Sequence, residues 1–381
     1  AQESRGLGDV YKRQDLEITM SIPLTADASL HPLVLPARAD AADAVEFREL
    51  ARVRNAVYRE LTGRTEQDLT PEALLPILRS RKERTTAVWT VRVEGEMVGR
   101  TVIDIPHEAG SRVAIASIEL HPRVWGRGIG TAILPHVEAF ARLHDRTVIQ
   151  NWTEQPASEG PRLQPRTGFG SVPDDHVARF LVRHGFSLEQ VYRVSRLKID
   201  PETVRHAEQL RDQARASSPD YRVIRWMLPT PPEHVEGYAW LKSRMSTDAP
   251  SADLEADEEV WDAQRLIESE KRVAEMGQII QVTVAQHVGT GELSAFTELR
   301  IGPDLGATTH QHDALVLKEH RGHRLGQLVK CDALLSWTGL APESRDVITY
   351  NAEENRPMLS INEAMGFTAI AYEGAWKKEL S

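Results

Sequence analysis

Two short loops rich in glycine and arginine carry the residues of this chain best suited to bind an anion. The first reads WGRGIG, from Trp125 to Gly130, and the second reads RGHRLG, from Arg321 to Gly326. Each loop lies between a run typical of a β-strand and a run typical of a helix. At such a turn successive backbone N–H groups face a bound anion, and the positive end of the helix dipole strengthens the attraction. The two loops therefore predict two sites for a phosphate or a pyrophosphate.

The residues expected at the two sites belong to the loops, to the adjoining strand ends and helix starts, and to a later turn rich in asparagine. They are Leu120, Trp125, Gly126, Arg127, Gly128, Ile129, Gly130, Thr131, Leu317, Arg321, Gly322, His323, Arg324, Leu325, Gly326, Asn351 and Asn355.

Two other phosphate-binding patterns agree less well with the first loop. A Rossmann fingerprint, G-x-G-x-x-G, follows the first strand of its domain. Here Gly126, Gly128 and Gly130 recur at every second residue, after what reads as a fourth strand. A Walker A loop, G-x-x-x-x-G-K-[ST], is absent from the sequence.

Titratable side chains stand just before each loop, where they could move protons. Alternation along the strand VAIASIELH puts Glu119 and His121 on one face, and either is expected to act as a general base. The alternatives are that Glu119 is a salt-bridged strand residue and that His121 shapes the turn before Pro122. Asp313 lies 313 − 117 = 196 residues after Ser117, the same separation as between the two loops (321 − 125), and it is the third candidate base.

The stretch HQHD, from His310 to Asp313, also contains residue types that bind metals. Zinc usually needs three or four converging ligands, and two histidines with one adjacent aspartate supply fewer. A polar entry to a strand is the favoured interpretation, and no metal is predicted.

The separation of 196 residues extends well beyond the loops. GEMVGRTVI at Gly95–Ile103 matches GELSAFTEL at Gly291–Leu299, and 291 − 95 is again 196. In both places a GE turn joins two runs rich in β-branched residues, which predicts a β-hairpin. The sequence is therefore an internal duplication.

Each copy reads as a strand, a helical region, a hairpin, a strand, a glycine loop, a helix, a strand, a helix closing in GF and a final strand. This order predicts an α/β fold in which a mixed, mostly antiparallel sheet is flanked by helices. The copies are placed at residues 20–200 and 219–381, joined by a polar linker over 201–218. Residues 1–19 lack an apolar core and resemble translated sequencing-adapter read-through, so a non-native or disordered leader is expected there.

The loops resemble the pyrophosphate loop of the GNAT (Gcn5-related N-acetyltransferase) superfamily, Q/R-x-x-G-x-G/A. The first copy matches it at Gly128 and Gly130, with a tryptophan at the Q/R position. The second copy matches at Arg321 and Gly326, while Arg324 replaces the central glycine. The resemblance covers about residues 30–200 and 220–381.

The family's late motif, an Asn-initiated helix ending in GF, is also present. The second copy has it over Tyr350–Phe367, and the first has it more loosely over Asp174–Phe186. The family often places a tyrosine, its general acid, four residues before the glycine of GF. Here those positions hold Leu181 and Asn362, so the thiolate leaves unaided or another residue protonates it.

The resemblance implies an N-acetyltransferase that moves an acetyl group from acetyl-CoA to a primary amine by direct attack in a ternary complex. A small-molecule amine is the expected acceptor, and a protein N-terminus is the alternative. Distant similarity to mycothiol synthase and to the enhanced-intracellular-survival acetyltransferases points the same way. A non-catalytic acyl-CoA-binding sensor or scaffold is the rival function. Which copy is catalytic, the acyl-donor length and the oligomeric state stay open.

Composition excludes several other classes of protein. Lys plus Arg number 46 and Asp plus Glu 56, so the net charge of −10 argues against a nucleic-acid partner. No apolar run is long enough to cross a membrane, and Cys331 is the single cysteine. A cytoplasmic protein, actinobacterial in its Arg- and Ala-rich style, is the expectation.

Overall fold

The computed structural model describes residues 21–156, 158–248, 250–255 and 259–380. The leader expected over residues 1–19 lies outside them. Two compact units are present, one formed by Ala1–Asn151 with Lys378–Ser381 and the other by Trp152–Lys377. Among the described residues, no helix combines the length and the apolar character needed to cross a membrane.

The first unit contains a sheet in the order β1-β2-β3-β4-β5-β6, antiparallel except for the parallel pair β5–β6. Its elements are β1 (Ile22–Pro23), β2 (Ala28–Pro32), α2 (Val45–Thr62), α3 (Pro71–Leu78), β3 (Arg84–Val93), β4 (Glu96–Pro106), β5 (Val113–Leu120), the 3-10 turn η1 (Pro122–Val124), α4 (Ile129–Leu143) and β6 (Val148–Pro156), which runs on into the second unit.

The predicted hairpin of the first copy is confirmed as β3–β4. Glu94 and Gly95 have φ values of 50° and 83°, the left-handed conformation that a two-residue hairpin turn requires. Helices α2 and α3 cover one face of this sheet through a core that includes Phe47, Leu50 and Leu74.

The second unit contains a sheet in the order β15-β9-β14-β13-β12-β11-β10, in which only β13 and β14 are parallel. Its elements are β7 (Arg162–Leu163) and β8 (Val172–Pro173), which pair separately, α5 (His176–Arg183), β9 (Ser187–Lys198), α6 (Pro201–Ala216), β10 (Tyr221–Met227), the 3-10 turn η2 (Pro232–His234), α7 (Val235–Asp248), α8 (Ala263–Glu275), β11 (Ile279–His287), β12 (Leu293–Ile301), β13 (Thr309–Val316), the 3-10 turn η3 (Lys318–His320), α9 (Leu325–Leu340), β14 (Asp346–Ala352), α10 (Arg356–Met365) and β15 (Thr368–Glu379).

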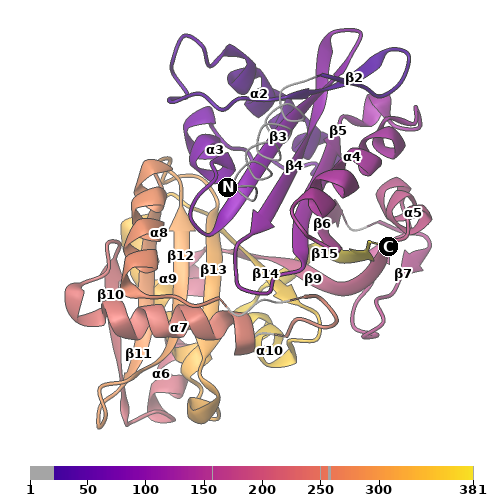
Figure 1. Ribbon diagram of the computed structural model, residues 1–381. Helices are drawn as coiled ribbons and strands as arrows, with labels where there is room; N and C mark the ends of the chain where they lie inside the picture. The colour runs from indigo at the N-terminus through magenta and orange to yellow at the C-terminus, as the bar shows by residue number, and fades with distance from the viewer. Residues whose placement is uncertain (1–20, 157, 249, 256–258, 381) are drawn as a thin grey trace. The chain divides into compact units, whose positions relative to one another are not determined.

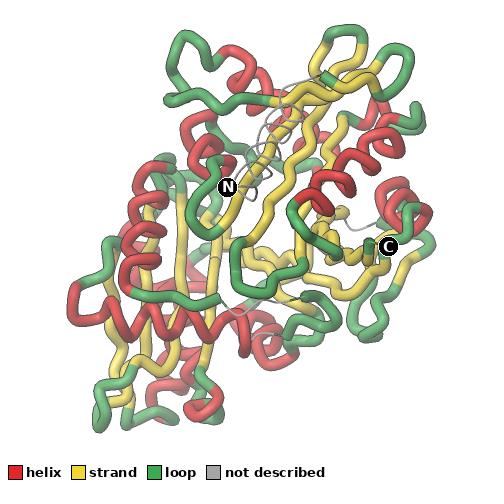
Figure 2. Tube along the Cα trace, viewed as in Figure 1, coloured by secondary structure: helices red, strands yellow, loops and turns green. Residues whose placement is uncertain are grey.

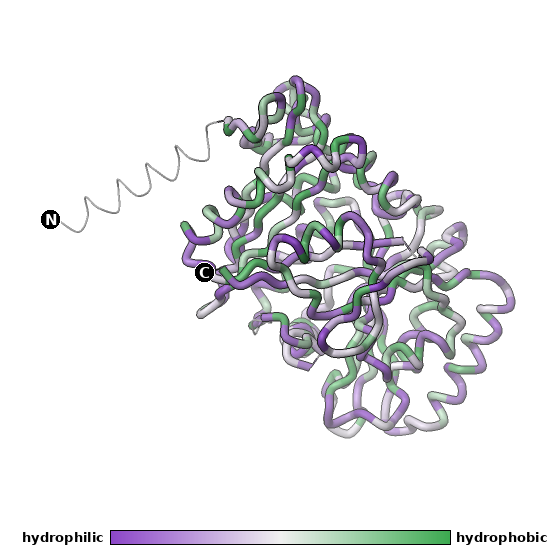
Figure 3. Tube along the Cα trace, turned by 90° about the vertical axis from the view of Figure 1, so that its right-hand side faces the viewer, coloured by the Kyte–Doolittle hydropathy of each residue, from purple (hydrophilic) through white to green (hydrophobic). Residues whose placement is uncertain are grey.

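Helices cover both faces of the second sheet. Helices α6 and α9 pack on one face around Leu210, Leu334 and Trp337, while α7 and α8 pack on the other around Tyr238 and Leu266. Figure 1 shows α7 running across strands β11 to β13, and Figure 2 shows the same helical layer in red over the yellow strands. The helices alternate between hydrophilic and hydrophobic stretches in Figure 3, as expected for helices with one face on a core.

The predicted linker over residues 201–218 is largely a helix. Asp200 caps α6 by accepting a hydrogen bond from the backbone N–H of Thr203 at 2.8 Å. Ala207, Leu210 and Ala214 recur at helical spacing and are buried in the second unit. This apolar stripe gives α6 a packing face, and the placement of the linker over 201–218 stays a prediction.

Strand β9 ends the first copy in the sequence but pairs with two strands of the second. It lies between β14 and β15, with Val194 opposite both Tyr350 and Ala371. The compact units therefore do not divide the chain where the repeated sequences meet. The boundaries 20–200 and 219–381 stay a prediction about the two copies.

Candidate active site

In each unit, one pair of parallel strands separates after a short paired stretch. Strands β13 and β14 pair only from Thr309↔Val347 to Gln311↔Thr349. Beyond that point β13 continues along β12 and β14 continues along β9. Their facing edges are therefore not paired with each other, and backbone N–H and C=O groups there can bind an extended ligand that carries amides.

The first unit repeats this arrangement between β5 and β6. The paired stretch runs from Val113↔Val148 to Ile115↔Gln150. Immediately beyond it, the side-chain amide of Asn151 donates a hydrogen bond to the carbonyl of Ala116. This contact bridges the start of the first gap.

A β-bulge distinguishes the second gap from the first. In the pair β12–β13, Thr297 lies opposite Ala314 and Leu299 lies opposite Gln311, so Glu298 faces the two residues His312 and Asp313. An extra residue of this kind redirects side chains and is frequent beside active sites. The pair β4–β5 keeps an unbroken register over Gly99–Asp104, without such a bulge.

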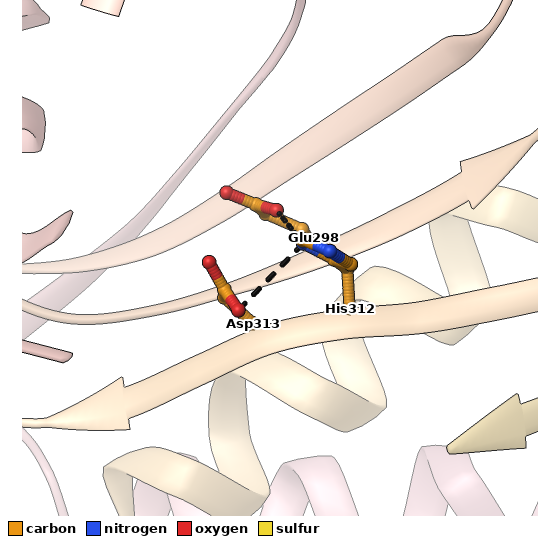
Figure 4. A group of neighbouring side chains, drawn as sticks. All are labelled: Glu298, His312 and Asp313. Carbon is orange, nitrogen blue, oxygen red and sulfur yellow. Dashed lines mark hydrogen bonds and ion pairs between the residues drawn. The ribbon is translucent and has the colours of Figure 1, made fainter. Parts of the chain in front are cut away.

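The bulge brings together a buried polar cluster, drawn in part in Figure 4. Glu298 is 3% exposed, and its Oε2 lies 2.9 Å from Nδ1 of His312. Its Oε1 accepts hydrogen bonds from Lys242 Nζ at 2.9 Å and from the hydroxyl of Tyr238. The Lys242 ammonium also donates to Asp313, the candidate base predicted from the sequence.

Charge pairing keeps Glu298 and Lys242 ionised despite their burial. Burial alone would raise the pKa of Glu298, but the Lys242 ammonium and His312 hold that pKa well below its usual range. Burial would lower the pKa of Lys242, and the carboxylates of Asp313 and Glu298 raise it instead. Asp313 is therefore held as the partner of an ammonium.

His312 is the member of the cluster best placed to take a proton. Its side chain is 42% exposed, and Glu298 holds Nδ1. A carboxylate on Nδ1 fixes the tautomer that leaves the lone pair on Nε2, the arrangement of a general base with its orienting acid. Glu298, His312 and Asp313 also offer ligand atoms within 4.8 Å of one another, a spacing that a metal ion could bridge. The Lys242 ammonium already contacts both carboxylates of this group.

Glu119, the candidate base of the first copy, lies in a different kind of cluster. Its carboxylate accepts two hydrogen bonds from the guanidinium of Arg100, at 2.6 and 3.1 Å, and one from the hydroxyl of Tyr58 at 3.1 Å. Burial would raise the pKa of Glu119, but the Arg100 and Arg54 guanidinium groups hold it below its usual range. His121, the other candidate base of the first copy, lies 3.2 Å from Oε2 of Glu60 through Nε2.

Both glycine loops have the conformation expected of an anion site. Gly128 and Arg324 occupy equivalent N-cap positions of α4 and α9, with left-handed φ values of 79° and 55°. Ala132 and Leu328 donate backbone hydrogen bonds to the carbonyls of Gly128 and Arg324, so Ile129, Gly130, Leu325 and Gly326 stand in the first turn, where backbone N–H groups face the helix N-terminus. A Cβ built on Gly126 or Gly322 would meet nothing within 4 Å, which leaves room for a phosphate.

The first residue of each loop donates a side-chain hydrogen bond to a backbone carbonyl five residues earlier, although the two side chains differ. The indole nitrogen of Trp125 donates to the carbonyl of Leu120 at 2.9 Å. Nε of Arg321 donates to the carbonyl of Val316 at 3.4 Å, again five residues earlier. The tryptophan at the family's Q/R position thus preserves the contact between loop and strand.

The other predicted binding residues have varied surroundings. Arg127 is ion-paired with Asp27, and the ring of His323 lies 5.5 Å from that of Tyr221. Gly326 is buried, and a Cβ there would lie 2.8 Å from Ile361, so close packing of α9 on α10 explains this glycine. Asn355 caps α10 by accepting from the N–H of Met358.

The remaining predicted residues fall into two groups by exposure. Those buried behind the loops are Leu120, Ile129, Leu317 and Leu325; Gly130 and Thr131 lie in the first turn of α4, where Thr131 is exposed. Asn351 lies on β14 beyond its pairing with β13.

Sequence reasoning missed Glu298, Lys242 and the role of His312. Alternation alone places Glu298 among the apolar residues of a central strand, and only the bulge turns His312 towards it. A buried glutamate within the run SAFTELRI was the available signal, since such a residue needs a partner.

Comparison with known proteins finds an acetyltransferase domain in part of the chain. Residues 50–159 match the model of the acetyltransferase (GNAT) family. Among solved structures, the chain is similar to a tandem GNAT protein from the clavulanic acid biosynthesis pathway, with 25% identity over 93% of this chain and 98% of that chain and a TM-score of 0.69. It is also similar to a GCN5-related N-acetyltransferase from Sphaerobacter thermophilus, with 15% identity over 94% and 97% of the chains and a TM-score of 0.58. A search of curated proteins gives no significant sequence match.

These findings confirm the duplicated mixed α/β fold expected from the sequence, while the more distant similarity to mycothiol synthase and the enhanced-intracellular-survival acetyltransferases stays a prediction. The chain carries an acetyltransferase domain of the GNAT family within a tandem GNAT fold, and it is an acyl-CoA-dependent acyltransferase.

Proposed function

We propose that the second copy transfers an acetyl group from acetyl-CoA to the primary amine of a small molecule. The observation that carries this proposal is the bulge in β13, which sets the His312–Glu298 pair beside the gap between β13 and β14. The loop Arg321–Gly326 would hold the pyrophosphate, and the edges of the gap would hold the amides of the pantetheine arm.

The chemistry needs one proton acceptor and one stabilised leaving group. The neutral amine attacks the thioester carbon, a C–N bond forms, and the C–S bond breaks with its electron pair left on sulfur. His312 Nε2 takes the proton of the amine, and the anionic Glu298 stabilises the imidazolium that results. Backbone N–H groups near the bulge are suited to the developing oxyanion.

The first copy supports a different function, acyl-CoA binding without transfer. Its loop has the same conformation as the second, with left-handed glycines at Gly126 and Gly128. However, Glu119 is already held by Arg100 and Tyr58, and Asn151 bridges the start of the gap. A regulatory or structural acyl-CoA site is the second candidate function, and these contacts favour it for this copy alone.

The acceptor and the place of action are extensions of the same proposal. A small molecule with a primary amine is the proposed acceptor, a protein N-terminus being the other amine of the same reactivity. The reaction as written needs no metal, and a cytoplasmic location would supply acetyl-CoA. Addition of a chelator should therefore leave transfer unchanged.

The test is a screen of amines with acetyl-CoA, followed by His312→Gln and Glu298→Gln on the amine that responds. Loss of a general base costs about 10²–10⁴ in kcat, so His312→Gln should fall by that factor while acetyl-CoA affinity is kept. His206→Gln, an exposed histidine of α6, is the matched control and should leave kcat unchanged. If acetyl-CoA binds and amines are acetylated at the normal rate by His312→Gln, the assignment of the base is wrong.

A further inference from the structure

A lysine in the core of the second unit has no carboxylate partner among the residues that the structure describes. Lys330 lies on α9 and is 2% exposed. Its ammonium donates a hydrogen bond to Oδ1 of Asn362 at 2.6 Å and lies 3.6 Å from the sulfur of Met358. Burial lowers its pKa to about 7, and the neighbouring thiol of Cys331 acts against this.

The groups packed around Lys330 explain why no charge neutralises it. From α10 come Asn362 and Met358, and the Phe367 ring before β15 lies 5.9 Å away. The nearest acid on α9, Asp332, is paired with Arg225. Glu363 of α10 is half-exposed and pairs with Arg193 and Arg356.

The ammonium fixes the orientation of two side-chain amides in series. A lysine ammonium can only donate, so Asn362 must turn its oxygen towards Lys330 and its nitrogen away. Nδ2 of Asn362 then donates to Oδ1 of Asn351 at 2.6 Å, and the hydroxyl of Thr349 donates to the same oxygen at 3.4 Å. With its oxygen occupied, Asn351 must present its NH₂ group on the opposite side, where it makes no hydrogen bond to any residue that the structure describes.

This unused donor belongs to the separated part of the strand pair. Asn351 lies two residues beyond Thr349, the last residue of β14 that pairs with β13. Its side chain is on the same face of β14 as Val347, which packs with the core of α9. The donor is therefore at the gap in which the proposed function places the reacting end of acetyl-CoA.

We propose that Lys330 is a positioning residue that, through Asn362, holds the amide of Asn351 as a hydrogen-bond donor for the sulfur of CoA as it leaves. The inference rests on the proposed function of the second copy. When the C–S bond breaks, the electron pair stays on sulfur, the amine proton is on His312, and the thiolate gains both the Asn351 N–H and the field of the buried ammonium. The two amides thus stabilise the leaving thiolate. They do so in a copy that has Asn362 at the position where the family often has a tyrosine.

The primary test needs no acceptor amine. The Lys330 ammonium is titrated by NMR in protein labelled with ¹³C-lysine, first free, then saturated with CoA, then saturated with acetyl-CoA, and Lys330→Met identifies its signal. A thiolate and a charged lysine stabilise each other, so the pKa of Lys330 should be higher with CoA than with acetyl-CoA, and the pKa of the bound CoA thiol should be lower than that of free CoA. Equal pKa values in the two complexes would overturn the proposal.

Two variants separate the amide route from a general effect of binding. Asn351→Ala keeps Lys330 but removes the terminal donor, and it should abolish most of the difference between CoA and acetyl-CoA. Lys198→Met removes an exposed lysine at the end of β9 and should leave the difference intact. A difference that persists in Asn351→Ala would also overturn the proposal.

Calorimetric titration of the same samples distinguishes a failure of the proposed function from a failure of the proposed role of Lys330. If neither CoA nor acetyl-CoA binds, the proposed function fails and the role of Lys330 fails with it. If both bind and the lysine does not respond, the role of Lys330 alone is wrong. Once an amine substrate is known, Lys330→Met should lower kcat while leaving KM for acetyl-CoA unchanged, because the donor acts on the leaving sulfur.

Discussion

The two roles considered for Glu119 are catalytic base and salt-bridged strand residue. Its buried ion pair with Arg100 allows a stability measurement to distinguish them. The side chains are 8% and 13% exposed, so removing one partner leaves a buried charge without compensation. Glu119→Gln should cost about 3–5 kcal/mol of unfolding free energy at pH 7, whereas the double change Glu119→Leu with Arg100→Met should cost much less. Denaturant midpoints of the two variants measure this directly.

The pH dependence of the same pair has a definite sign. Because the pKa of Glu119 is lowered in the folded protein, its contribution is complete above the unfolded value and is lost as the pH falls through the folded value. The stability difference between the native protein and Glu119→Gln should therefore shrink on acidification. A stable Glu119→Gln that transfers acetyl far more slowly would instead support its role as the base.

Lys330 predicts a pH dependence of the same sign, in a higher pH range. Its pKa of about 7 lies below the ordinary value of 10.5, so the folded state carries a cost for the charged form that is complete below pH 7 and disappears by about pH 10.5. Relative to Lys330→Met, the native protein should gain about 5 kcal/mol of unfolding free energy as the pH rises across that range. Denaturant unfolding at pH 6, 8 and 9.5 checks this, and a constant difference would show that Lys330 titrates normally.

The loop that starts α9 keeps its shape although arginine has replaced a glycine. Arg324 has a φ of 55°, a conformation that costs a residue with a side chain roughly 1–2 kcal/mol. Arg324→Gly should relieve this strain, and after the greater freedom of glycine in the unfolded chain is subtracted, about 0.5–1 kcal/mol of stabilisation should remain. Thermal unfolding without ligand measures it.

Arg321→Gly is the matched control in the same loop. Arg321 has a φ of −70°, which is not strained, and its Nε contacts Val316. This variant should lower the melting temperature, because it loses the contact and gains only freedom in the unfolded chain. Equal effects of the two glycine substitutions would mean that the left-handed position carries no strain.

The elements that follow from local pattern could be predicted, and those that depend on pairing could not. The GE hairpins, both glycine loops and the helices after them are signalled by turn residues and periodicity. The bulge at Glu298 depends on how β12 registers against β13, which the sequence of neither strand states. The place of β9 between β14 and β15 and the burial of Lys330 against α10 likewise arise from contacts distant in the chain.

At the scale of the whole molecule, duplication has kept the geometry of binding and changed the chemistry beside it. Both copies have a residue in the left-handed backbone conformation before the helix and a hydrogen bond from the loop to the end of the preceding strand. Both also have a pair of parallel strands that separates after a short paired stretch. Within the described residues, the second copy alone has the bulge and its His312–Glu298 pair. We therefore expect two acyl-CoA sites in one chain and a single site of transfer.

Two glycines at equivalent positions of the loops make it possible to test whether both copies bind acyl-CoA and only the second transfers the acetyl group. Gly126 and Gly322 are 322 − 126 = 196 residues apart and have φ values of 76° and 90°. Valine at either position would strain the backbone, since β-branched residues avoid this conformation, and its side chain would enter the open space where we expect the phosphate to bind. Calorimetric titration with acetyl-CoA should give two sites per chain for the native protein and one for each variant.

Gly322→Val should also lose acetyl transfer, whereas Gly126→Val should retain it, because the backbone strain is the same in both variants and only the copy differs. Loss of transfer in Gly126→Val alone would assign the chemistry to the first copy and return Glu119 to the position of catalytic base.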